Sequence, residues 1–134
     1  MYDIHYNAID SNAIPILKES DEPMKVNDEL MSNFVLELRR GTLVLSVLSQ
    51  LQQPQYGYSL VQSLEEKGLT IDPGTLYPLL RRLEKQDLLI SEWETTGTKP
   101  RKYYRISETG MEIYRLLCIE WDHLVTGTNR MLNS

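Results

Sequence analysis

Residues 72–85 read Asp-Pro-Gly-Thr-Leu-Tyr-Pro-Leu-Leu-Arg-Arg-Leu-Glu-Lys, and they carry the strongest structural signals in the chain. Asp72 followed by Pro73 marks the start of a helix, because an aspartate side chain caps free backbone N–H groups and proline suits the first turn. Leucines then recur at the helical period and predict one buried face, made by Leu76, Leu79, Leu80 and Leu83.

The opposite face of this predicted helix is cationic. A helical wheel places Gly74, Pro78, Arg81 and Lys85 on it and Thr75, Arg82 and Tyr77 beside it. Together they supply three cations, a hydroxyl group and an aromatic ring. Arginine and threonine suit base edges in the major groove of DNA, and a helix N-terminus offers N–H donors to a phosphate. An ordinary solvated helix has the same pattern, so the wheel alone leaves both interpretations open.

Pro78 is unusual on this face, and its position depends on where the helix begins. If Asp72 is the cap, Pro78 lies in the second turn and removes a hydrogen bond from the helix. If Thr75 is the cap, Pro78 lies in the first turn, where its missing N–H costs little. Both starts are compatible with the sequence.

The preceding residues predict further helices. Residues 28–52 have apolar side chains at helical spacing and form either one long helix or two helices that divide at Gly41. Residues 56–58 are typical of a short turn, and residues 59–67 form the next helix with Ser59 as its cap.

The following residues change from the helical period to the period of a strand. Residues 88–94 predict a strand in which Leu88, Ile90 and Trp93 alternate with polar neighbours, and residues 102–106 predict its returning partner. The order helix, helix, helix, hairpin, helix is that of a winged helix-turn-helix, a mainly α fold with a small β component.

The hairpin tip at residues 95–100 is the wing of such a fold. Lys99, Arg101, Lys102 and Arg105 lie within seven residues of one another. Cations on a hairpin tip can reach phosphates or the minor groove, although lysines also protect strand edges from pairing. A charged tip beside a charged helix favours a DNA-binding function.

A final helix of about 24 residues follows the cap at residues 107–109. Its apolar side chains alternate in steps of three and four and exceed what a small core can cover, so we expect this face to pack on another chain. The predicted dimer interface consists of Met111, Tyr114, Leu117, Cys118, Trp121, Leu124 and Val125.

The net charge of −5 over 134 residues argues at first against a nucleic-acid partner, but the charge is uneven. Residues 1–38 hold 2 basic and 8 acidic residues, net −6. Residues 39–105 hold 10 basic and 7 acidic residues, net +3, and residues 106–134 hold 2 basic and 4 acidic residues, net −2. The predicted DNA-binding elements therefore lie in a basic segment.

Composition excludes several other functions. The single cysteine, Cys118, permits neither an internal disulfide nor a zinc cluster, and His5 and His123 lack ligand-like spacing. No catalytic triad or phosphate-binding loop is apparent, so we expect no enzyme activity, metal or cofactor. Neither a membrane span nor a secretory signal is visible, and we expect a cytoplasmic protein.

Three motifs resemble the PadR family of transcriptional regulators. They are Gly57-Tyr58, residues 74–84 (Gly-Thr-Leu-Tyr-Pro-Leu-Leu-Arg-Arg-Leu-Glu) and residues 101–110 (Arg-Lys-Tyr-Tyr-Arg-Ile-Ser-Glu-Thr-Gly). The resemblance covers residues 37–133 and implies a dimeric winged-helix repressor whose third helix reads operator DNA. By position it implies DNA contacts at Thr75, Tyr77, Pro78, Arg81, Lys99, Arg101 and Lys102, with Tyr56 bracing the site or touching a phosphate.

The single C-terminal helix resembles the short PadR subfamily, in which some members bind flat aromatic compounds at the dimer interface. Trp121 occupies a similar place, and either a small aromatic effector or plain dimer packing explains it. The sequence thus divides into an acidic extension (1–29), which is an ordered arm or a loose tail, a winged helix-turn-helix domain (30–106) and a dimerisation helix (107–134).

We therefore expect a homodimeric repressor that binds double-stranded DNA at an inverted repeat with half-sites about one helical turn apart. The alternative is a winged-helix protein-interaction module that does not bind DNA.

Overall fold

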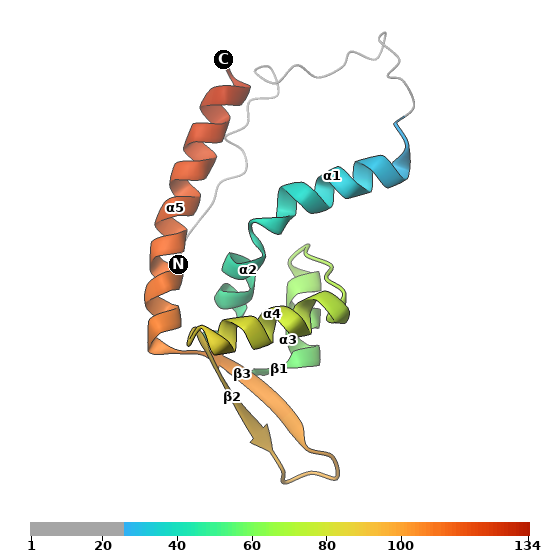
Figure 1. Cartoon of the computed structure of the whole chain (residues 1–134), viewed down its shortest axis with the longest axis vertical. Helices are drawn as coiled ribbons and strands as arrows, with labels where there is room; N and C mark the ends of the chain where they lie inside the picture. Colours follow the sequence, from blue (N-terminus) through green and yellow to red (C-terminus); the bar gives the residue numbers. More distant parts are fainter. Residues whose placement is uncertain (1–25) are drawn as a thin grey trace. The chain divides into compact units, whose positions relative to one another are not determined.

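The computed structural model describes residues 26–134, and eight helices and strands follow one another along them (Figure 1). They are α1 (Asp28–Arg40), α2 (Leu43–Gln50), β1 (Gln55–Tyr56), α3 (Gly57–Glu66), α4 (Pro73–Lys85), β2 (Leu89–Glu94), β3 (Arg101–Ile106) and α5 (Glu108–Leu132). Thr42–Leu117 form one compact unit, and the described residues before and after them form a second. The acidic extension predicted for residues 1–29 lies almost wholly outside the described residues.

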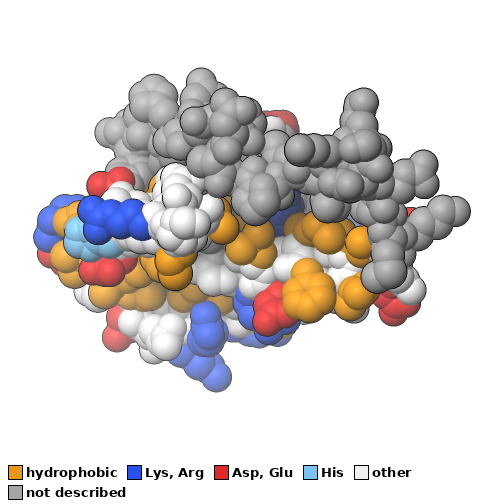
Figure 2. All heavy atoms as spheres, turned by 90° about the horizontal axis from the view of Figure 1, so that it is seen from above, with side chains coloured by type: hydrophobic (Ala, Val, Ile, Leu, Met, Phe, Trp, Pro, Cys, Tyr) orange, Lys and Arg blue, Asp and Glu red, His pale blue; other side chains and the backbone are white. Residues whose placement is uncertain are grey.

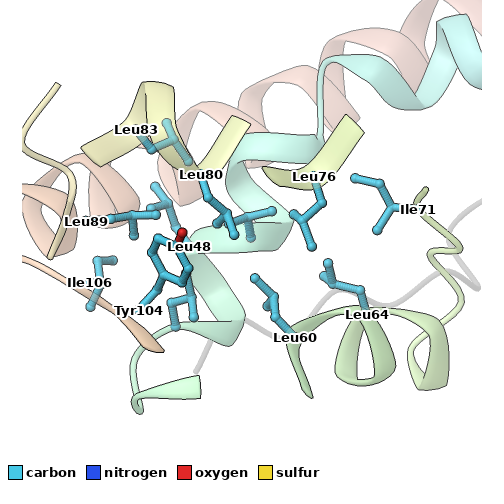
Figure 3. Packing of buried hydrophobic residues seen from close by; sticks show 12 residues of the cluster. Leu48, Leu60, Leu64, Ile71, Leu76, Leu80, Leu83, Leu89, Tyr104 and Ile106 are labelled. Atoms are coloured by element: carbon cyan, nitrogen blue, oxygen red, sulfur yellow. The ribbon is translucent and has the colours of Figure 1, made fainter. Parts of the chain in front are cut away.

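The unit Thr42–Leu117 has the predicted winged helix-turn-helix fold, with α3 and α4 as the helix pair and β2 and β3 as the wing. Its core is a cluster of buried apolar side chains from α2, α3, α4 and the sheet (Figure 3). These are Val47, Leu48, Leu51, Leu60, Leu64, Ile71, Leu76, Leu80, Leu83, Leu89, Tyr104 and Ile106. Three of the four leucines predicted for the buried face of α4 belong to it, and Leu79 packs against it while partly buried.

The region predicted as one or two helices contains two. α1 ends at Arg40 and α2 begins at Leu43, so the chain divides at Gly41 and Thr42. Val47 and Leu48 of α2 are completely buried, whereas α1 has no buried residue.

The sheet is antiparallel with the strand order β1-β3-β2, so β3 lies in its centre. Gln55 pairs with Tyr104 and Tyr56 pairs with Tyr103. The prediction of a plain turn at residues 56–58 was therefore wrong, and so was the cap at Ser59, because α3 already begins at Gly57. Tyr56 precedes that helix in an extended conformation and makes no side-chain cap.

The β2 strand was predicted correctly, but the assignment of its faces was wrong. Leu89 pairs with Ile106 and is only 2% exposed, whereas Ile90 on the opposite face is 37% exposed. Strand side chains alternate with a period of two, so an error of one residue in register moves each side chain to the other face. Trp93 shares the core-facing side with Leu89 but is 62% exposed.

The start of α5 is attached to the turn between α4 and β2. The Ser107 hydroxyl accepts a hydrogen bond from the Gly110 backbone N–H (2.9 Å) and donates one to the Asp87 carbonyl (2.5 Å). Asp87 has a positive φ of 64°, which aspartate tolerates better than most residues. The first turns of α5 then pack against the core through Ile113, Tyr114 and Leu117.

The second unit contains α1 and the part of α5 from Cys118 onward. Asn27 caps α1, because its side-chain oxygen accepts a hydrogen bond from the Glu29 backbone N–H (2.8 Å). Both helices expose apolar side chains among charged ones, as the space-filling view of one face shows (Figure 2). No helix within residues 26–134 has the length and apolar character needed to cross a membrane.

Candidate nucleic-acid interface

The start of α4 determines the position of Pro78. The Asp72 carboxylate accepts a hydrogen bond from the Gly74 backbone N–H (3.0 Å), and the Asp72 carbonyl accepts bonds from the Thr75 and Leu76 N–H groups (2.8 and 3.0 Å). Asp72 is thus the cap, and Pro78 lies inside the helix in its second turn. Proline has no N–H to donate, so the Gly74 carbonyl lacks its usual helical partner on the exposed face.

The exposed face of α4 is made of the residues that the wheel predicted. Thr75, Pro78, Arg81, Arg82 and Lys85 are all exposed. Among the ion pairs formed within residues 26–134, none involves one of these three cations. Their charge is therefore available to an anionic partner.

Tyr77 lies beside this exposed face and also packs against α3. Its ring lies against Gly57 at the start of α3, where an added Cβ atom would stand 2.5 Å from Cε1 and 2.6 Å from Oη. Glycine at position 57 therefore permits the close approach of α3 and α4. Tyr77 is half-buried and helps to set the orientation of the cationic helix.

Lys102 is held beside α4 instead of extending from the wing tip. Its Nζ atom lies 3.6 Å from Glu84 Oε1 and sits over the rings of Trp93 (5.8 Å) and Tyr104 (5.4 Å). The other carboxylate oxygen of Glu84 accepts a hydrogen bond from the Ser91 hydroxyl. Glu84 thereby links α4 to both strands of the hairpin.

Tyr56 connects β1 to the wing. Its hydroxyl donates to the Glu94 carboxylate, the Arg101 guanidinium lies 5.0 Å from its ring centre, and the Tyr103 ring meets it edge-on. This arrangement fits the bracing role that the family resemblance implied for Tyr56. Lys99 and Arg101 are both exposed, so two of the predicted wing cations face solvent.

Tyr103 and Glu92 form a second cross-strand pair, with the Tyr103 hydroxyl donating to Glu92 at 2.7 Å. That hydrogen bond is the main reason that the pKa of Tyr103 lies above its usual value, with smaller contributions from burial and the charges of Glu92 and Glu94. The roles of Glu92 and Glu94 were missed in the sequence. Hairpin register offered a signal, because a tip at residues 95–100 places these glutamates opposite Tyr103 and Arg101.

The residues predicted for a dimer interface on α5 have different surroundings. Tyr114 and Leu117 pack against the core of their own chain, whereas Leu124 is 62% exposed. Met111 is also exposed, and Cys118, Trp121 and Val125 are half-buried. The Trp121 Nε1 atom is shielded from solvent and has no hydrogen-bond partner among the described residues.

Comparison with known proteins shows which family has this winged helix-turn-helix domain. The PadR-like family of transcriptional regulators matches residues 44–116, more than half of the chain. The chain belongs to the PadR-like family. The transcriptional regulator Rv3488 of Mycobacterium tuberculosis is 36% identical over 75 residues, which cover 55% of this chain and 70% of that protein. The family is one of transcriptional regulators and not of enzymes.

Solved structures of other PadR proteins have the same fold. A PadR family transcriptional regulator from Eggerthella lenta matches with a TM-score of 0.76 and 52% identity, covering 80% of this chain and 96% of its own. A PadR-like transcription factor from Bacteroides fragilis matches with a TM-score of 0.63 and 37% identity, covering 74% and 98%. Bacillus subtilis PadR in complex with operator DNA shares the fold at a TM-score of 0.54 and 20% identity, covering 58% and 46%.

Proposed function

We propose that this PadR-like protein is a sequence-specific repressor that binds double-stranded DNA as a homodimer. The observation that carries the proposal is the exposed face of α4, where Arg81, Arg82 and Lys85 have no acidic partner within residues 26–134. A helix of this kind fits the major groove, where arginine binds guanine edges with two hydrogen bonds. Lys99 and Arg101 extend the cationic surface into the wing, which contacts phosphates or the minor groove.

The dimer follows from the apolar side chains that α5 exposes. Met111, Leu116, Ile119 and Leu124 are between 41% and 62% exposed on this helix. Several large apolar side chains left exposed on one helix are typical of a contact between chains. Two copies related by a twofold axis present two copies of α4 to an inverted repeat, with half-sites about one helical turn apart.

The decisive test is the affinity of Arg81→Ala for a duplex that the wild-type protein selects from a random-sequence library. We expect Arg81→Ala to weaken binding by about 1–3 kcal/mol, because it removes a base or phosphate contact. Arg115→Ala is the matched control, since it removes the same charge from an exposed position on α5 that pairs with Glu112. Its DNA affinity should equal that of the wild type.

A salt titration separates this function from a protein-interaction module. The logarithm of the DNA association constant should fall steeply with the logarithm of salt concentration, as phosphate contacts require. A wild-type protein that selects no duplex and shows no salt-dependent DNA affinity would support the interaction module and refute the repressor.

The proposal also includes a small aromatic effector at the dimer interface. It is supported by the Trp121 Nε1 donor, which lacks a partner among the described residues. Planar aromatic compounds should quench the Trp121 fluorescence. Quenching that persists unchanged in Trp121→Ala would assign the signal to Trp93 and remove Trp121 from the effector site.

A further inference from the structure

Trp93 has an exposed aromatic side chain that does not belong to the hydrophobic core. It lies on β2 opposite Lys102, on the same face of the sheet as the buried Leu89, but beyond the edge of the core. Its side chain is 62% exposed. A large apolar ring in this position contributes little to stability and is a candidate for contact with a partner.

Trp93 lines a hollow of about 450 Å³ between the start of α3, the helix α4 and the hairpin. Aromatic rings and cations make up much of its wall, including Tyr58, Tyr77, Arg81, Trp93, Arg101 and Lys102. Tyr58 is 58% exposed, so a second large ring is also open to solvent here. Every charged residue that lines this hollow is basic.

The position of the hollow indicates its occupant. α4 on one side is the helix proposed for the major groove, and the hairpin on the other is the wing proposed for the phosphates or the minor groove. Adjacent major and minor grooves are separated by one sugar–phosphate strand, so a protein that enters both must straddle that strand. Its phosphates match Arg81 and Arg101 in charge, and the carbon face of deoxyribose is apolar like the Trp93 ring.

We propose that this hollow receives the sugar–phosphate backbone of one DNA strand and that Trp93 packs against its deoxyribose. The inference rests on the proposed DNA-binding function. It adds an apolar contact with the sugar to the proposed contacts with bases and phosphates. A small flat compound is a poorer fit, because small-molecule sites enclose most of their ligand, whereas this hollow is open to solvent.

The test compares Trp93→Ala with the wild type on the selected duplex at several salt concentrations. We expect the affinity to fall about tenfold, as for removal of a well-packed aromatic contact. The drop should be the same at every salt concentration, because tryptophan carries no charge and releases no counterions. Arg101→Ala, in contrast, should reduce the salt slope by about one.

Two further variants distinguish the loss of a DNA contact from the loss of the fold. Trp93→Phe keeps an aromatic ring and should bind with intermediate affinity. Ile90→Ala changes an apolar residue on the other face of β2 and should bind like the wild type. Thermal unfolding of each variant checks that the fold is intact. If Trp93→Ala is unfolded, the comparison of Trp93→Phe with the wild type decides.

A fluorescence measurement reports on the contact directly. The chain has two tryptophans, so Trp121→Phe leaves Trp93 as the sole reporter. Acrylamide should quench Trp93 strongly in the free protein and weakly once the duplex is bound. Unchanged quenching, or wild-type affinity in Trp93→Ala while Arg81→Ala is impaired, would overturn the inference and leave the repressor function intact. A wild-type protein without DNA affinity would overturn both.

Discussion

Gly110 shows how a single residue joins the last helix to the winged domain. A Cβ atom at this position would stand 2.1 Å from the Leu88 carbonyl oxygen and 2.7 Å from Ile106 Cγ1. The first of these neighbours is backbone, so a side-chain rotation cannot relieve the contact. Only glycine permits the first turn of α5 to approach the turn before β2 this closely.

Gly110→Ala should therefore destabilise the protein. We expect a loss of about 1–3 kcal/mol or more in the free energy of unfolding, the usual cost of overpacking a tight site. Gly127→Ala is the control, because it changes another glycine of α5 that has open space around its Cβ position. The control should be neutral or slightly stabilising, since alanine favours a helix over glycine. Urea unfolding of the three proteins measures the difference, and equal stability would contradict the steric argument.

Residues with strong local signals could be predicted from the sequence, and residues that depend on pairing could not. The cationic face of α4 depends on neighbours within the same helix, and the structure has it. The sequence left Asp72 and Thr75 both open as the cap of that helix, and the structure has the cap at Asp72. Glu92 and Glu94 act across the sheet, so their contacts with Tyr103 on β3 and Tyr56 on β1 appear only when the strand pairing is known.

The same contrast between local signals and long-range pairing applies to whole helices and strands. The α4 helix and the β2–β3 hairpin have strong periodicity and turn signals, and both were predicted. β1 has only two residues and exists because Gln55 and Tyr56 pair with β3, which is far away in the sequence. The faces of β2 were ambiguous because residues 88–90 are all apolar, so alternation cannot distinguish the buried side.

We expect Pro78 to lower the stability of α4 while contributing to its DNA-binding surface. It interrupts the hydrogen bonding of the helix on its exposed face, where packing offers no compensation. Pro78→Ala restores the N–H donor and should stabilise the protein by about 1–3 kcal/mol, since proline inside a helix costs up to about 3 kcal/mol. For a domain of this size that gain raises the melting temperature by several degrees.

The same variant should bind DNA more weakly, because it removes the Pro78 ring from the face that we propose enters the groove. Lys85→Ala serves as a comparison within the helix, with a lower DNA affinity but an unchanged melting temperature. Calorimetry and a binding titration together test the prediction. A Pro78→Ala protein that is no more stable than the wild type would show that α4 accommodates the proline without cost.

The distribution of charge is a property of the whole chain. The net charge is −5, although residues 39–105, which contain α4 and the wing, carry +3. Net negative charge elsewhere repels DNA at long range, so we infer that binding depends on the few cations that touch the duplex. Affinity for DNA of unrelated sequence should be low and should disappear early as salt rises.

The dimer is the remaining property of the whole molecule, and Leu124 offers a sharp test of it. Its side chain is 62% exposed on α5, so a charged residue there costs the monomer little. Within an apolar interface the same charge must be desolvated without a partner, which should dissociate the dimer. Sedimentation at micromolar concentration should show a dimer for the wild type and a monomer for Leu124→Asp, with weaker binding to an inverted repeat. Glu120→Gln, an exposed change on the same helix, should remain dimeric. A wild-type protein that sediments as a monomer would remove the dimer and require that a single copy of α4 and its wing account for all DNA affinity.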